Sequence, residues 1–252
     1  MFPLRDDNPT LRTSITTFSL IGVNVACWAL VQGFGSEAKL VESVCQLGVI
    51  PGELLGTVPA GTTVPLGPTA SCQIEGSGHW ATLVTSMFMH GGWMHLIGNM
   101  WFLFVFGDNV EDSMGRGRFL AFYLLCGLAA ALAEVFVQSG SALPMVGASG
   151  AIGGVMGAYA ILYPRAPVHM LIVIILYFTR IIVPAWLMLG YWFAIQLFSG
   201  FVSIGASGGG TAFWAHAGGF LAGVTLIFLF RDPELVATHR RAIARGGHFR
   251  PH

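Results

Sequence analysis

Five polar residues interrupt stretches of the chain that are otherwise apolar: His90, His95, Asn99, Ser149 and His216. A serine hydroxyl is a poor nucleophile until a base removes its proton, and histidine does this near neutral pH. We therefore interpret Ser149 as a nucleophile and His216 as its general base, a dyad suited to acyl transfer. Because His95 and Asn99 are four residues apart, they share a helix face and can point at the same oxyanion as the backbone N–H of Ser149.

The composition places these residues in a membrane protein. The chain has 252 residues, of which 54% are hydrophobic and 10% are charged, and its mean hydropathy is +0.71. A water-soluble domain of this size needs far more charge to cover its surface. The formal net charge is zero and Lys39 is the single lysine, so the chain has no basic footprint for a nucleic acid.

The apolar stretches predict six helices that cross a bilayer, and so an all-α membrane domain over residues 14–230. A cytoplasmic segment (1–13) precedes this domain and a solvated cytoplasmic tail (231–252) follows it. The stretch 169–178 is too short to cross, so we expect it at the membrane interface. The first apolar stretch has no cleavage site after it, so we interpret it as a permanent helix. The predicted spans are 14–31, 81–106, 119–137, 149–163, 181–198 and 213–230, with a long first loop at 33–78.

The arginines predict the orientation of the six spans. The N-terminus, the connections between spans two and three and between spans four and five, and the C-terminus can share one side. That side then holds every arginine in the chain, whereas the other side has only Lys39. Positively charged loops stay in the cytoplasm, so both termini are predicted to be cytoplasmic. The polar groups of spans two, four and six then lie at similar depth in the outer half of the membrane.

The fourth predicted span is short, which sinks its polar end below the membrane surface. Residues 149–163 cover roughly 21 Å of the membrane normal, against about 30 Å of hydrocarbon. Ser149 therefore lines a submerged polar cavity. If the helices of Ser149 and His216 meet, the two side chains come within about 2.6–3.2 Å. Small residues on the same faces allow this close packing: Gly153 and Gly157 with Ser149, and Gly219 and Gly223 with His216.

The four cysteines leave one question open. Cys27 and Cys126 lie in apolar spans, where they act as packing residues. Cys45 and Cys72 share the first loop and form a disulfide if that loop faces an oxidising compartment; two free thiols are the alternative. No spacing of cysteines or histidines is typical of a zinc site, so we predict no metal.

Four motifs resemble those of the rhomboid family of intramembrane serine proteases. They are HGGWMHLIGN (90–99), EDSMGRGRF (111–119), GASG (147–150) and AHAGGFLAG (215–223), in the family's order along the chain. The resemblance implies a six-helix fold that cleaves other membrane proteins within or near their transmembrane helices, where the scissile site has small and helix-weakening residues. It implies no metal, nucleotide or other cofactor. The site residues that it implies are Ser149 and His216 as catalytic, Asn99, His95 and Ser149 as the oxyanion hole, and His90, Gly147, Gly150, Gly219 and Gly223 as structural.

Two positions depart from the family pattern. The family commonly has Trp-Arg just before the second span, whereas this chain has Trp80 followed by Ala81. An aromatic residue often lies four positions after the nucleophile, beneath the catalytic histidine, and this chain has Gly153 there. The orientation of His216 is then expected to depend on another ring, with Tyr159, Trp214 and Phe213 as the candidates.

Three other functions fit parts of the pattern less well. A transporter also has polar residues and short helices within the membrane, but the chain has no obvious internal repeat and few acids. A metal site from His90, His95 and His216 lacks an HExxH motif. A rhomboid relative that binds membrane clients without cutting them loses the dyad, which is present here. The small size favours a bacterial inner membrane, and the sequence predicts no oligomeric state.

Overall fold

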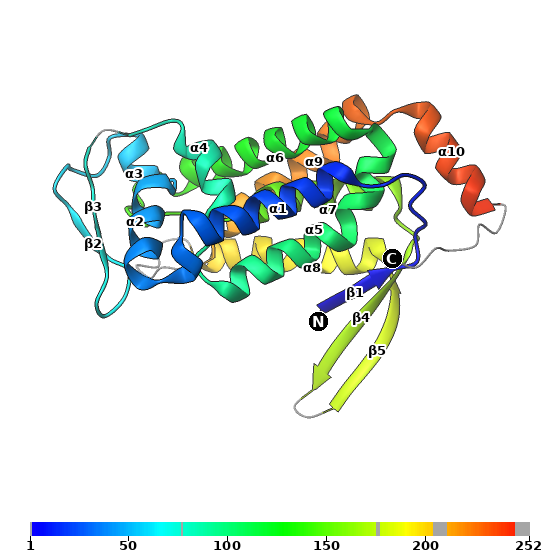
Figure 1. The fold of residues 1–252 in the computed structure, drawn as a ribbon, viewed down its shortest axis with the longest axis horizontal. Helices are drawn as coiled ribbons and strands as arrows, with labels where there is room; N and C mark the ends of the chain where they lie inside the picture. The colour runs from blue at the N-terminus through cyan, green and yellow to red at the C-terminus, as the bar shows by residue number, and fades with distance from the viewer. Residues whose placement is uncertain (1, 77, 175–176, 204–210, 245–252) are drawn as a thin grey trace.

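Six helices form the body of the protein and lie side by side in the computed structural model, which describes residues 2–76, 78–174, 177–203 and 211–244 (Figure 1). The helix α7 lies in the middle, and nearly all of its residues are buried. Its neighbours supply the surrounding surface, with α9 and α6 in closest contact. The six are α1 (Ile15–Leu30), α5 (Trp93–Met114), α6 (Arg116–Val137), α7 (Ser149–Leu162), α8 (Ala185–Ser203) and α9 (Phe213–Phe230).

Three helices in the described part of the chain are long and apolar enough to cross a membrane: α6, α8 and α9. The helices α1 and α7 are apolar but shorter. The helix α5 is long, with 22 residues, but its last turns carry Asp108, Glu111 and Asp112. The span predicted at 213–230 is confirmed as a helix with the same bounds.

The span predicted at 81–106 is interrupted, so that part of the sequence prediction is wrong. A short helix α4 (Thr82–Thr85) and the 3-10 turn η2 (Ser86–Phe88) come first, and α5 begins only at Trp93. The cause is the pair Gly91-Gly92, because glycine in a helix interior is unfavourable and Gly92 has extended backbone (φ 163°). His90 therefore lies in the interruption and not on a helix.

The first loop is a folded unit that rests on the end of the bundle near Ser149 (Figure 1). Cys45 on α2 and Cys72 on β3 form a disulfide with a Cα–Cα distance of 5.5 Å, which decides between the two alternatives for these cysteines. Val49 pairs with Met145 through two backbone hydrogen bonds, so the loop is joined to the segment before α7. The elements of this loop are η1 (Gly33–Gly35), α2 (Glu37–Leu47), α3 (Pro51–Leu54), β2 (Thr63–Pro65) and β3 (Ser71–Gln73).

A three-stranded antiparallel sheet projects from the opposite end of the bundle, where only helices and loops were predicted (Figure 1). Its order is β1-β4-β5, from β1 (Phe2–Asp6), β4 (Pro167–Ile174) and β5 (Tyr177–Pro184). The stretch expected at the interface thus forms a hairpin, because β-branched valine and isoleucine suit strands. The helix predicted from residue 181 begins at Ala185, after the strand ends at Pro184.

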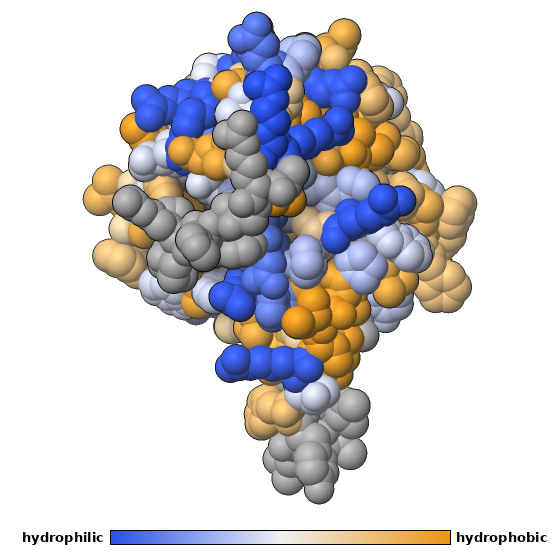
Figure 2. All heavy atoms as spheres, turned by 90° about the vertical axis from the view of Figure 1, so that its right-hand side faces the viewer, coloured by the Kyte–Doolittle hydropathy of each residue, from blue (hydrophilic) through white to orange (hydrophobic). Residues whose placement is uncertain are grey.

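The predicted solvated tail is also partly wrong, because residues 233–244 form the helix α10 (Pro233–Ala244). Val236 and His239 are buried against the bundle, and His239 lies 2.7 Å from the carbonyl oxygen of Pro9. Hydrophilic side chains gather around this end of the molecule, whereas an apolar stripe follows the sheet (Figure 2). Residues 245–252 of the predicted tail lie outside the described residues.

Candidate active site

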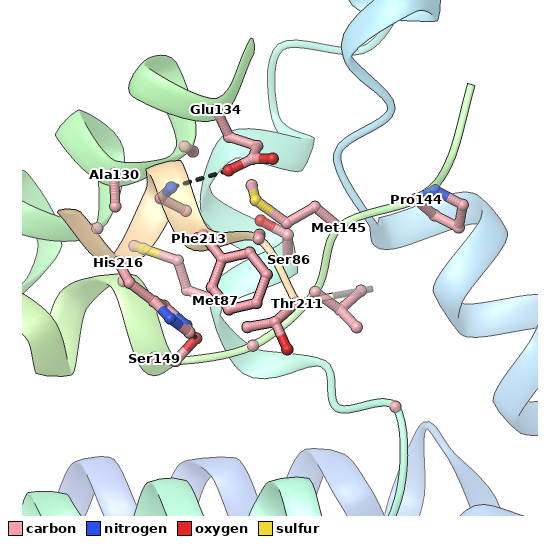
Figure 3. A pocket seen from close by; sticks show the side chains of 18 of the residues that line it. Ser86, Met87, Ala130, Glu134, Pro144, Met145, Ser149, Thr211, Phe213 and His216 are labelled. Carbon is pink, nitrogen blue, oxygen red and sulfur yellow. Dashed lines mark hydrogen bonds between the residues drawn. The ribbon is translucent and has the colours of Figure 1, made fainter. Parts of the chain in front are cut away.

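Ser149 and His216 are in direct contact, as the sequence predicted. The distance from Ser149 Oγ to His216 Nε2 is 2.7 Å. The two side chains point toward each other from α7 and α9 at the edge of a pocket (Figure 3). The distance is within hydrogen-bond reach, which is the geometry that a nucleophile and its base require.

Close packing of α7 against α9 produces this contact. A Cβ atom on Gly219 would overlap the backbone of Gly150, and one on Gly223 would overlap the backbone of Gly154. The two backbones therefore touch along successive turns, which only glycine permits. Because Ser149 is the first residue of α7 and His216 lies in the first turn of α9, both functional groups come to the same end of this helix pair.

His95 and Asn99 line the same pocket from α5. The side-chain nitrogen of Asn99 is buried, and it has no hydrogen-bond partner within the described part of the protein. The N–H of Gly91 donates to His95 Nδ1 at 3.3 Å. In the neutral ring the proton is then on Nε2, so His95 can donate from that atom.

Gly147 makes room for the His95 ring beside Ser149. Its φ of 130° lies in the region that favours glycine, and an added Cβ would lie 2.7 Å from His95 Nε2. The first glycine of the GASG motif thus lets His95 Nε2 approach the peptide that precedes Ser149. The N–H of Ser149, as the first residue of its helix, has no acceptor within that helix.

The site is a pocket of about 590 Å³, large enough to hold a short stretch of extended peptide. The first loop contributes Pro51. The segment before α7 contributes Met145, and α6 contributes Ala130 and Glu134 (Figure 3). Polar and apolar groups both line it, so it can take an apolar side chain and a peptide bond together.

Two residues of α8 complete the surroundings of His216, and the sequence analysis missed both. The side-chain oxygen of Gln196 lies 2.8 Å from His216 Nδ1. The ring of Trp192 lies beside the imidazole, with centroids 5.8 Å apart and planes at 36°. Two of the expected rings have other partners, since Trp214 packs on Phe201 and Tyr159 bonds to Asp6. The third, Phe213, lines the same pocket as His216. Gln196 was detectable as another polar residue within an apolar span.

Comparison with known proteins agrees with these observations. Residues 77–233 match the family model of the Rhomboid domain. The chain belongs to the rhomboid family. All the proposed site residues lie inside the matched domain, and the rhomboid membership together with the apolar helices makes the chain an integral membrane protein.

Three curated relatives illustrate the similarity of this rhomboid. RHOMBOID-like protein 5 of Arabidopsis thaliana is 35% identical over 85 residues, which are 34% of this chain and 27% of the relative. Rhomboid protease GluP of Bacillus subtilis (strain 168) is 39% identical over 103 residues, 41% of this chain and 20% of the relative. Rhomboid protease AarA of Providencia stuartii is 35% identical over 102 residues, which are 35% of this chain and 36% of the relative. The chain thus spans about a third or less of these relatives' lengths.

His90 lies beside His95 of this rhomboid site. Its ring contacts the ring of His95 edge-on, with centroids 5.2 Å apart. The side chain of Gln32 bonds to both the N–H (2.8 Å) and the carbonyl (2.9 Å) of His90. Through its backbone, the residue therefore ties the end of α1 to the segment that precedes α5.

Glu134 has a role in the rhomboid domain that the sequence did not reveal. Its carboxylate accepts a hydrogen bond of 2.8 Å from the N–H of Ala215 in the first turn of α9 (Figure 3). Ala212, the N-cap residue of that helix, has no side-chain oxygen for this purpose. Glu134 thus caps α9 from a neighbouring helix, one residue before His216.

Proposed function

We propose that this rhomboid is an intramembrane serine endopeptidase that cleaves other membrane proteins in or near their transmembrane segments. The observation that carries the proposal is the 2.7 Å contact of Ser149 Oγ with His216 Nε2 inside the pocket. The relatives named rhomboid proteases support the same reaction class.

In the first half-reaction, His216 Nε2 takes the hydroxyl proton while Ser149 Oγ attacks the carbonyl carbon of the substrate peptide. The carbonyl oxygen becomes an oxyanion, and three groups can donate to it: the Asn99 amide, His95 Nε2 and the backbone N–H of Ser149. The protonated His216 then gives its proton to the leaving amine, and the peptide bond breaks to leave an acyl-enzyme ester.

In the second half-reaction, a water molecule replaces the amine. His216 Nε2 removes a proton from this water, which attacks the ester carbonyl, and the same donors hold the second oxyanion. The proton returns to Ser149 Oγ as the acid product leaves. The cycle needs no metal and no cofactor, and every proton that moves passes through His216.

In the proposed arrangement, six spans cross a bacterial inner membrane and both termini lie in the cytoplasm. The arginines favour a cytoplasmic location for the end with the sheet and α10. The Cys45–Cys72 disulfide lies in the first loop, at the other end. Because disulfides persist in oxidising compartments, it supports an extracytoplasmic first loop with Ser149 close beneath it.

The substrates are single transmembrane segments with small, helix-weakening residues at the scissile bond. A helical peptide bond is already paired within the helix, so the segment must unwind before its carbonyl can reach Ser149 Oγ. A small side chain also suits the wall of the pocket formed by Gly127, Ala130 and Ala131 of α6.

Reconstitution with a model transmembrane substrate tests this proposal. We expect cleavage by the native protein and none by Ser149→Ala or His216→Ala in the same liposomes. A fluorophosphonate labels an activated serine without regard to substrate choice, so labelling that depends on both residues separates a wrong substrate from a wrong mechanism. Cleavage or labelling that survives in Ser149→Ala overturns the proposal.

A further inference from the structure

The helix α8 provides a hydrogen-bond acceptor for the second nitrogen of the His216 ring. Gln196 Oε1 lies 2.8 Å from His216 Nδ1, while Nε2 on the other side of the ring faces Ser149 Oγ. Trp192, one turn earlier on α8, lies beside the imidazole. Residues four apart share a helix face, so α8 presents a polar contact and an aromatic contact together.

The orientation of the Gln196 amide follows from its other contact. Gln196 Nε2 lies 3.4 Å from the backbone carbonyl of Trp192. A carbonyl oxygen only accepts hydrogen bonds, so the amide nitrogen must face it and Oε1 must face His216. His216 Nδ1 then carries the proton. The lone pair is left on Nε2, where it can accept the proton of Ser149.

The reverse arrangement would disable the dyad. If the amide turned over, its NH₂ group would donate to His216 Nδ1 and the ring proton would move to Nε2. An Nε2–H cannot take a proton from Ser149 Oγ. The Gln196 side chain thus selects the tautomer of His216 that can act as a base.

Space for this arrangement comes from Gly153 on α7. A Cβ at Gly153 would lie 3.0 Å from the carbonyl oxygen of His216 and 3.7 Å from Cη2 of Trp192. A larger side chain at this position would displace the tryptophan ring. The missing side chain at Gly153 therefore leaves the space that the ring of Trp192 occupies.

Gln196 is the group that contacts His216 Nδ1 in this buried environment. Its side chain is buried, with 8% of the residue exposed, so water competes little for the bond. The titratable groups near His216 are His95 from α5, which faces the pocket, and Glu134 from α6, which bonds to the N–H of Ala215. In the described part of the chain, no carboxylate has a hydrogen bond with His216.

We propose that Gln196 is a positioning residue for His216: it fixes the ring in the tautomer that deprotonates Ser149, with Trp192 holding the plane of the ring. This proposal rests on the proposed protease function. It makes α8 part of the catalytic apparatus through contacts to His216 alone, since Gln196 does not touch the reacting atoms.

The test compares the pH dependence of kcat in liposomes for the native protein, Gln196→Met, Gln196→Glu and the control Ile195→Met, which lies on the exposed face of the same helix. We expect Gln196→Met to lower kcat by about tenfold, in line with one lost hydrogen bond, while KM stays within about twofold. The carboxylate of Gln196→Glu keeps the acceptor and favours the protonated ring, so we expect most of kcat to return and the acidic limb to move about one unit to higher pH.

The result identifies which proposal fails. An unchanged kcat in Gln196→Met, or an unmoved acidic limb in Gln196→Glu, overturns the positioning role while Ser149→Ala remains inactive. Activity in Ser149→Ala overturns the protease function itself. If Gln196→Met folds poorly, as judged by its unfolding midpoint against that of Ile195→Met, Gln196→Glu decides the question because it preserves the size of the side chain.

Discussion

Asn99 illustrates how a single buried amide acquires a chemical role in this molecule. Asn99 lines the pocket, and its buried side-chain nitrogen has no partner in the part of the protein that the structure describes. A buried donor without an acceptor costs free energy. In the proposed mechanism that cost is recovered when an oxyanion forms on the substrate, so the donor would favour the transition state over the resting site.

We expect Asn99→Ala to lower kcat by about 10²–10³, the usual effect of removing one oxyanion donor. KM should change little, because the contact forms in the transition state. Steady-state cleavage in liposomes measures both constants, and the unfolding midpoint in detergent checks the fold. An unchanged kcat would remove Asn99 from the oxyanion hole.

At the scale of elements, the pair α7 and α9 sets the position of both proposed catalytic side chains. The backbones touch at Gly150 with Gly219 and at Gly154 with Gly223. Each contact keeps the helices at a distance that no larger residue allows, and the Ser149–His216 contact depends on that distance.

Gly223→Ala should therefore separate the two helices. The added methyl group would overlap the backbone oxygen of Gly154, and such overpacking typically costs about 1–3 kcal/mol. We expect a lower unfolding midpoint in mixed micelles and loss of most fluorophosphonate labelling. Gly190→Ala on α8 is the matched control, since a Cβ there meets nothing within 4 Å. Equal behaviour of the two variants would contradict this view of the helix pair.

Two helices of the bundle are capped by glutamates from other helices. Glu111 on α5 accepts hydrogen bonds from the N–H groups of Thr16 (3.0 Å) and Thr17 (2.8 Å) at the start of α1. Glu134 on α6 serves α9 in the same way. A carboxylate at a helix N-terminus satisfies free N–H groups and complements the helix dipole.

Removal of the α9 cap should weaken the fold and the site together. We expect Glu134→Ala to lower the free energy of unfolding by about 1–2 kcal/mol, as the loss of an N-cap does. Glu134→Gln retains an oxygen acceptor and should lie between Glu134→Ala and the native protein. Unfolding in mixed micelles gives the free energies, and identical values for all three proteins would exclude a capping role.

At the scale of the whole molecule, a polar cluster fastens the N-terminal strand to the bundle. Tyr159 on α7 donates a hydrogen bond to Asp6 of β1, and Thr10 donates one to Asp108 of α5 at 2.7 Å. Burial, followed by the charge of Asp108, raises the pKa of Asp6 from 3.8 to about 8. The folded protein thus holds the Asp6 proton more tightly than the unfolded chain does.

Stability should therefore fall as the pH rises from about 4 to about 8, the interval in which the folded state binds more protons. The slope from Asp6 is at most about 1.4 kcal/mol per pH unit. Asp6→Asn should flatten the dependence, whereas Glu42→Gln, an exposed control far from the cluster, should not. Unfolding midpoints between pH 5 and 8 measure this, and parallel curves for Asp6→Asn and the native protein would refute it.

The sequence predicted the parts of this fold that hydrophobicity and motif spacing determine. The helix 213–230 and the contact of Ser149 with His216 belong to this group. The hairpin of β4 and β5 was not predicted, because a short apolar run is ambiguous between strand and helix. Trp192 and Gln196 were missed for another reason: their contacts with His216 depend on how α8 lies against α9, which no local pattern encodes.

The pocket volume bears on the second half-reaction. The space of about 590 Å³ that can hold the substrate peptide also has room for water once the amine product leaves, at roughly 30 Å³ for each molecule. In the proposed cycle each turnover consumes one water molecule, and lipid tails supply none. Water admitted to this pocket would favour hydrolysis of the proposed acyl-enzyme over re-formation of the bond with the departing amine.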